Sequence, residues 1–164
     1  MSLGLHLTIH FLFALLAGFV VWKKWRQPLV AFSAAIAGGF LIDLDHFFDY
    51  VVAFAFDFNL EYFSNGYYNL RNGKIFYLLH GWEYVAIFVI IGFLIKKSMR
   101  WKSFFLALAL GMFFHLSVDV LINEGMRKEG YFLTYRAYNK FNIEKIVSES
   151  GYQKYLFKKQ ELGF

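Results

Sequence analysis

Four apolar runs dominate this chain, and each is long enough to cross a lipid bilayer, which takes about 20 helical residues. They lie at about residues 3–22, 28–47, 76–95 and 104–122. With 59% hydrophobic residues and a single proline, the chain is too apolar for a soluble domain, where about half of the residues are apolar. Inside hydrocarbon the backbone must pair its own polar groups, which favours helices. The sequence therefore predicts an all-α, polytopic membrane protein with a bundle of four transmembrane helices over residues 1–122.

Small residues gather in the second run, where they would let neighbouring helices approach closely. They are Ala34, Ala35, Ala37, Gly38 and Gly39. Pro28 stands at the start of this run, a position that suits proline because the first helical residue needs no amide hydrogen bond. We therefore expect a closely packed helix that begins near Pro28.

Residues 123–164 have a different character, because aromatic residues alternate there with Arg136 and Lys140. This pattern predicts an amphipathic, aromatic-basic C-terminal helix at the membrane surface, with tyrosines at the level of the headgroups. Packing of this tail on the aromatic connection 48–75 is compatible with that position. The chain is thus expected to divide into a transmembrane metal-binding domain, 1–122, and a C-terminal tail, 123–164.

The two short links between the first and second runs and between the third and fourth runs are basic. They hold seven lysines and arginines: Lys23, Lys24, Arg26, Lys96, Lys97, Arg100 and Lys102. Because positive residues stay in the cytoplasm, we expect a multi-pass protein of the inner (cytoplasmic) membrane with both termini outside. The net charge of +5 is explained by topology and lipid headgroups. No motif points to nucleic acid.

Ionisable residues inside the apolar runs lie at the ends that antiparallel threading brings to one membrane face, the extracytoplasmic one. Each costs roughly 2.5 kcal/mol or more to insert, which makes it a functional candidate. Imidazole and carboxylate without cysteine form the ligand set of a catalytic metal site. The ten residues are His6, His10, Asp43, Asp45, His46, Asp49, His80, Glu83, His115 and Asp119.

Helical spacing orders this set. His6 and His10 are four residues apart, as are His115 and Asp119, so each pair shares one helix face. The carboxylates around His46 point in more than one direction, so some are expected to hold a ligand imidazole through its other nitrogen. We expect one or two divalent ions, zinc above all, with Glu83 or Asp43 as the general base. The expected metal ligands are His6, His10, Asp45, His46, His80, His115 and Asp119.

The stretch 41–46 (LIDLDH) resembles the DxDH signature of a bacterial and archaeal family of small membrane-bound hydrolases classed as metal-dependent, of the LexA-binding, inner-membrane-associated type. The HxxxD element His115–Asp119 follows in the family's order, so that the resemblance covers about residues 5–122. The family's third run often reads HRxxTHS. Here His80-Gly81-Trp82-Glu83 has one histidine fewer, with Glu83 in its place. The resemblance implies metal-dependent hydrolysis.

The HxxxD pattern on helices is also similar to the zinc-dependent phospholipase C class, an analogy of ligand chemistry that raises the expectation of lipid or phosphoester cleavage. A site that opens at the membrane surface suits a lipid-linked or amphiphilic ester or phosphoester. Two alternatives stay open. One is a non-enzymatic accessory protein in which metal only holds the helices together, and the other is ion or proton transport. The opposite halves of the runs are almost wholly apolar, which argues against transport. Expected partners are membrane lipids and an amphiphilic substrate, and a homo-oligomer is compatible with the sequence.

Overall fold

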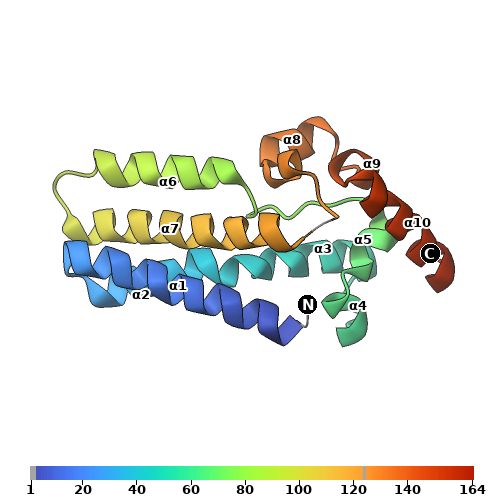
Figure 1. The fold of residues 1–164 in the computed structure, drawn as a ribbon, viewed down its shortest axis with the longest axis horizontal. Coiled ribbons are helices and arrows are strands. Elements are labelled where there is room, and N and C mark those ends of the chain that lie inside the picture. Colours follow the sequence, from blue (N-terminus) through green and yellow to red (C-terminus); the bar gives the residue numbers. More distant parts are fainter. Residues whose placement is uncertain (1–2, 124) are drawn as a thin grey trace. The chain divides into compact units, whose positions relative to one another are not determined.

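A computed structural model describes residues 3–123 and 125–164 of the chain (Figure 1). In this part of the chain the secondary structure is helical, with two isolated antiparallel bridges and no β-strand, which confirms the all-α prediction. The chain divides into two compact units, each built from two separate stretches of sequence. The first unit contains residues 1–42 and 81–119, and the second contains residues 43–80 and 120–164.

Four long helices form the first unit. They are α1 (Leu3–Trp25), α2 (Pro28–Gly39), α6 (Trp82–Leu94) and α7 (Met99–Ile122), of which α7 continues past the unit's last residue. Pro28 occupies the first turn of α2, as predicted. The core between α1, α2 and α7 is made largely of small side chains, including Ala17, Ala34, Ala35 and Ala107.

Glycines set how closely these helices approach. A Cβ atom built on Gly111 of α7 would lie 2.5 Å from the carbonyl oxygen of Ala35 on α2. One built on Gly39 of α2 would lie 2.9 Å from the Cβ atom of Ala14 on α1. Real side chains essentially never approach so closely, so these helices pack backbone against backbone, as the small residues of the second run predicted.

Two helices, α1 and α7, are long and apolar enough to cross a membrane, and there are three candidates if α2 and the following helical stretch to Phe54 form one bent span. The prediction of four spans is not confirmed. In the third apolar run, helix α6 has 13 residues, which gives a length of about 20 Å at 1.5 Å per residue. The helix begins at Trp82, so His80 lies in the non-helical segment before it.

The second unit is assembled from short helices. The 3₁₀ turn η1 (Leu41–Leu44) leads into α3 (Asp45–Phe54), which α4 (Leu60–Ser64) and α5 (Tyr67–Asn72) follow. In the C-terminal part, η2 (Lys128–Tyr131), α8 (Leu133–Tyr138), α9 (Ile143–Ile146) and α10 (Glu149–Leu162) take the place of the one amphipathic helix that was expected. Side chains of Asn59, Asn142 and Ser148 cap the first turns of α4, α9 and α10, which stabilises the start of each of these helices.

Residues of the C-terminal part pack on the connection between α3 and α6. Leu70 and Ile75 share one buried cluster with Ile143, Ile146 and Val147. Lys74 and Asn142 form an antiparallel bridge beside this cluster. The packing of the tail on the 48–75 connection, compatible with the sequence, is therefore present in the second unit.

Candidate metal centre

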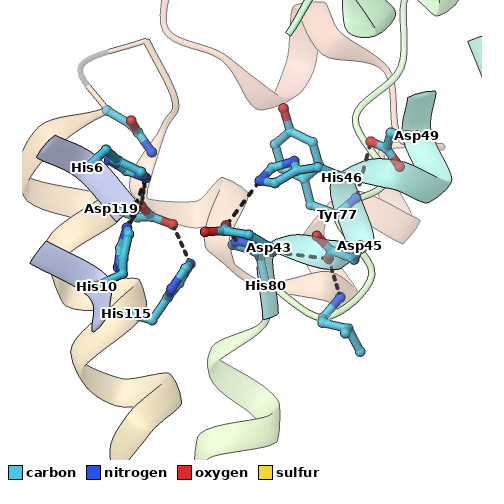
Figure 2. A network of polar contacts seen from close by, with 12 residues as sticks. His6, His10, Asp43, Asp45, His46, Asp49, Tyr77, His80, His115 and Asp119 are labelled. Atoms are coloured by element: carbon cyan, nitrogen blue, oxygen red, sulfur yellow. Dashed lines mark hydrogen bonds and ion pairs between the residues drawn. The ribbon is translucent and has the colours of Figure 1, made fainter. Parts of the chain in front are cut away.

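A first group of histidine and aspartate side chains lies within the first unit, on α1 and α7. His10, His115 and Asp119 present ligand atoms within 4.8 Å of one another, a spacing that can hold a metal ion. His6 joins them, with its Nε2 atom 2.9 Å from His10 Nε2 and 3.7 Å from an Asp119 oxygen. We call these four residues the Asp119 group (Figure 2). His10 and His115 are fully buried, and Asp119 is 4% exposed.

Two separations in the Asp119 group match a metal's ligand shell. Metal–nitrogen bonds of about 2.0–2.1 Å in a tetrahedral zinc site place neighbouring ligand atoms about 3.3 Å apart. His10 Nε2 lies 3.3 Å from Asp119 Oδ1, and His115 Nε2 lies 3.2 Å from Asp119 Oδ2. The spacing of His6 and His10, and of His115 and Asp119, along their helices produces this convergence.

The tautomer of His115 is fixed by its surroundings. Its Nδ1 atom lies 3.2 Å from the carbonyl oxygen of Gly39, which can only accept, so Nδ1 carries the hydrogen. In the neutral ring Nε2 is then an acceptor that faces the Asp119 carboxylate, also an acceptor. A proton or a metal ion must lie between two such atoms.

A second group lies within the second unit and contains Asp43 on η1, His46 on α3 and His80 on the segment before α6. We call it the Asp43 group (Figure 2). Asp43 Oδ1 lies 3.4 Å from His46 Nε2 and 3.3 Å from His80 Nε2. The three ligand atoms again lie within 4.8 Å of one another.

Both imidazoles of the Asp43 group are held through their other nitrogen. His80 Nδ1 donates to Asp45 Oδ2 over 3.1 Å, and that oxygen also accepts the backbone N–H of Leu79 over 2.7 Å. His46 Nδ1 lies 3.1 Å from the hydroxyl of Tyr68. This carboxylate–histidine arrangement is the one that orients metal ligands in known metalloproteins. In the neutral ring, Nε2 of His80 is then an acceptor that faces an Asp43 oxygen, as Nε2 of His115 faces Asp119; in the charged ring it donates to that oxygen.

Two further side chains hold the segment that carries His80. Asp49 accepts the backbone N–H groups of Phe76 and Tyr77 over 2.9 and 3.4 Å. Arg136 of α8 is fully buried and donates to the carbonyl oxygens of Phe76, Tyr77 and His80 over 3.0, 2.7 and 2.9 Å. A segment without helical hydrogen bonds thereby gains partners for its backbone.

Two tyrosines, Tyr68 and Tyr77, lie beside His46 in the second unit. The ring of Tyr77 packs edge to face on the imidazole of His46, with the two ring centroids 4.2 Å apart. Asn69 Nδ2 donates a hydrogen bond to the Tyr77 hydroxyl. Burial raises the pKa of Tyr68 and of Tyr77 well above the usual value. Both phenols therefore stay neutral and act as hydrogen-bond partners rather than as anions.

The predicted site residues thus fall into two sets. Six of the seven expected ligands, all but Asp45, belong to one of the two groups. Asp45 supports His80 from behind, whereas Asp43, expected as a base, faces both Nε2 atoms. Glu83, half-buried on the first turn of α6, lies against Gly81 and in neither group. Residue roles at these positions stay predictions.

Arg136, Tyr68, Tyr77 and Asn69 were missed by sequence reasoning. Arg136 was noted only as one basic residue in an aromatic stretch, and no local pattern distinguishes a buried arginine from a surface one. The two tyrosines belong to a connection whose fold depends on contacts with residues more than 50 positions away.

A cavity of about 520 Å³ lies in the first unit, away from both groups in the sequence. No histidine lines it; its lining residues are Leu29, Val30, Ser33, Arg100, Trp101 and Phe104.

Comparisons with known proteins identify no relative, so the interpretation of this site depends on its geometry. No family model, no curated protein and no solved structure matches the chain.

Proposed function

We propose that this chain is an integral membrane, metal-dependent hydrolase of the type that its DxDH and HxxxD elements resemble. The observation that supports this most directly is the pairing of imidazole nitrogens with carboxylate oxygens. His80 Nε2 lies 3.3 Å from Asp43 Oδ1, and His115 Nε2 lies 3.2 Å from Asp119 Oδ2. Protonation would satisfy one such contact. A metal ion satisfies several at once, and each carboxylate here has more than one imidazole within 3.5 Å.

Zinc suits a ligand set of imidazole and carboxylate without thiolate. A bound zinc ion would supply Lewis acidity and would activate water at neutral pH. In the proposal Asp45 and the Tyr68 hydroxyl hold the two imidazoles of the Asp43 group in the orientation that presents Nε2. Glu83, or an oxygen of Asp43, takes up the proton during hydrolysis.

The proposed substrate is a lipid-linked or amphiphilic ester or phosphoester. Its support is the apolar surface on η1 and α3, beside Asp43 and His46 in the sequence. Leu44 is 66% exposed, and Phe47, Phe48 and Val52 are each close to half exposed. Such a surface suits an acyl or isoprenoid chain or the membrane itself, and the scissile group would then lie near the two Nε2 atoms.

Hydrolysis is tested with purified full-length chain in detergent micelles against a panel of lipid phosphoesters and lipid esters. The proposal predicts turnover that stops on removal of metal by a chelator, returns with zinc, and falls at least about 100-fold in His80→Ala, because that variant loses a ligand. Asp57→Asn, which changes an exposed carboxylate of the same unit, should leave turnover unchanged. Turnover that survives both chelation and His80→Ala would contradict the proposal.

One observation favours a second function, an accessory protein whose metal only stabilises the fold. His10 and His115 are wholly buried on two long helices, as in a structural site. In that case chelation would unfold the chain, and no lipid ester or phosphoester would be cleaved.

A further inference from the structure

We propose that the two groups hold their ions in different ways: the Asp119 group retains an ion permanently, and the Asp43 group holds an exchangeable ion that faces substrate. This inference rests on the metal binding proposed above and not on hydrolysis. It concerns the lability of each site, which burial and support by the surrounding elements determine.

The Asp119 group is closed. Three of its residues, His10, His115 and Asp119, present ligand atoms that all lie within 4.8 Å of one another. The side chains of His10 and His115 are 0% exposed and that of Asp119 is 5% exposed. The side chain of His6 is 21% exposed, so a chelator meets the three buried ligands only after His6 or the surrounding helices move.

The helices that carry the Asp119 group resist that separation. His10 belongs to α1 and His115 to α7, and both helices pack on α2 through glycines that leave no room for a side chain. The imidazoles of His10 and His115 stack with their centroids 4.0 Å apart. His115 is also anchored to α2 through the Gly39 carbonyl. Loss of an ion from this site therefore requires partial unfolding of the first unit.

The Asp43 group is open by comparison. It also offers three ligand residues, and their partial exposure leaves a fourth position open to water or substrate, as in catalytic zinc sites. The side chains of His46 and Asp43 are 24% and 20% exposed. One ligand, His80, lies on a non-helical segment rather than on a long helix. An ion here can meet a chelator without unfolding of the chain.

Chelator competition tests this difference on full-length chain in detergent micelles, loaded with zinc alone. Release into excess chelator is followed with a zinc indicator, and bound zinc is counted by elemental analysis. We expect two phases of equal amplitude whose rates differ at least about 100-fold. Asp43→Asn should remove the fast phase and leave the slow one, and Asp57→Asn should leave both. His6→Ala should accelerate the slow phase alone, because it removes the partly exposed side chain that lies against His10 and Asp119.

Release in a single phase, or loss of the slow phase in Asp43→Asn, would overturn the inference. Circular dichroism shows whether each variant is folded, and His6→Ala tests the slow phase independently if Asp43→Asn is not. The outcomes also separate the two proposals. Two phases without turnover on any lipid would refute hydrolysis and keep the division of sites. Turnover together with zinc release in a single phase would support hydrolysis and refute the division of sites.

Discussion

At the scale of single residues, the chemistry of this chain depends on which nitrogen of each imidazole carries the hydrogen. A carbonyl oxygen fixes the tautomer of His115, and the Asp45 carboxylate fixes that of His80. In both rings Nε2 is left to face an aspartate. The orienting partner is thus as important to the site as the ligand itself.

Substitution of an orienting partner should weaken metal binding without abolishing it. Asp45→Asn keeps the size of the side chain but no longer attracts the His80 Nδ1–H with a full charge. Loss of such a partner typically costs about 10–100-fold in metal affinity. Zinc titration should show that decrease for the Asp43 group, and Asp43→Asn should lose the site altogether. Equal affinity in Asp45→Asn and wild type would refute the orienting role.

The gathering of histidines and aspartates was largely predictable from the sequence, because such residues four apart on an apolar helix must share a face; their role as metal ligands stays a prediction. The partition between ligand and supporting carboxylate was not predictable. Asp43 and Asp45 lie in a 3₁₀ turn and at the start of a helix, where the regular 3.6-residue period that the prediction used does not apply. The position of the Asp45 carboxylate also depends on a hydrogen bond from the backbone N–H of Leu79, 34 positions away.

At the scale of elements, glycine contacts fix how α1, α2 and α7 pack. Gly111→Ala should destabilise the first unit by roughly 1–3 kcal/mol, because its Cβ atom would overlap the Ala35 carbonyl and force the helices apart. Gly4→Ala on α1 is a matched control, since nothing lies within 4 Å of the Cβ position there, and alanine favours helix. Thermal unfolding in detergent should show a lower midpoint for the first variant alone. An unchanged midpoint in Gly111→Ala would contradict this packing.

A second element-scale prediction concerns α8 and the segment that carries His80. Arg136→Met removes donors from the carbonyl groups of Phe76, Tyr77 and His80 and leaves them buried. Hydrogen bonds to charged groups contribute about 1.5–3 kcal/mol each, so we expect a loss of several kcal/mol in the second unit together with loss of zinc from the Asp43 group. Arg127→Met, whose side chain donates to Val147, should cost less and keep the zinc. Retained zinc in folded Arg136→Met would contradict the supporting role.

At the scale of the whole molecule, the apolar runs predicted an all-helical chain, which is confirmed, and four full spans, which are not confirmed. The third run is interrupted before Trp82, and the second breaks after Gly39. In both places the backbone leaves the helix beside Asp43 or His80. Local pattern cannot reveal the break before Trp82, because Arg136 and Asp49, which are distant in sequence, supply the hydrogen bonds of that segment.

Membrane orientation can be tested with single cysteines, since the chain has none of its own. Ser98→Cys lies in the basic link between α6 and α7, and Ser64→Cys lies at the end of α4. The positive-inside rule predicts that a membrane-impermeant maleimide labels Ser64→Cys in intact spheroplasts and Ser98→Cys only in inverted vesicles. The opposite labelling pattern would reverse the orientation.

The central claim is that the facing imidazoles and carboxylates hold metal, and elemental analysis of purified full-length chain tests it most directly. The account predicts at least one zinc ion per chain after dialysis against metal-free buffer. It also predicts a lower content in His115→Ala and in His80→Ala, since each variant removes a ligand from one group. A folded chain that binds no divalent metal, before or after incubation with zinc, would contradict it.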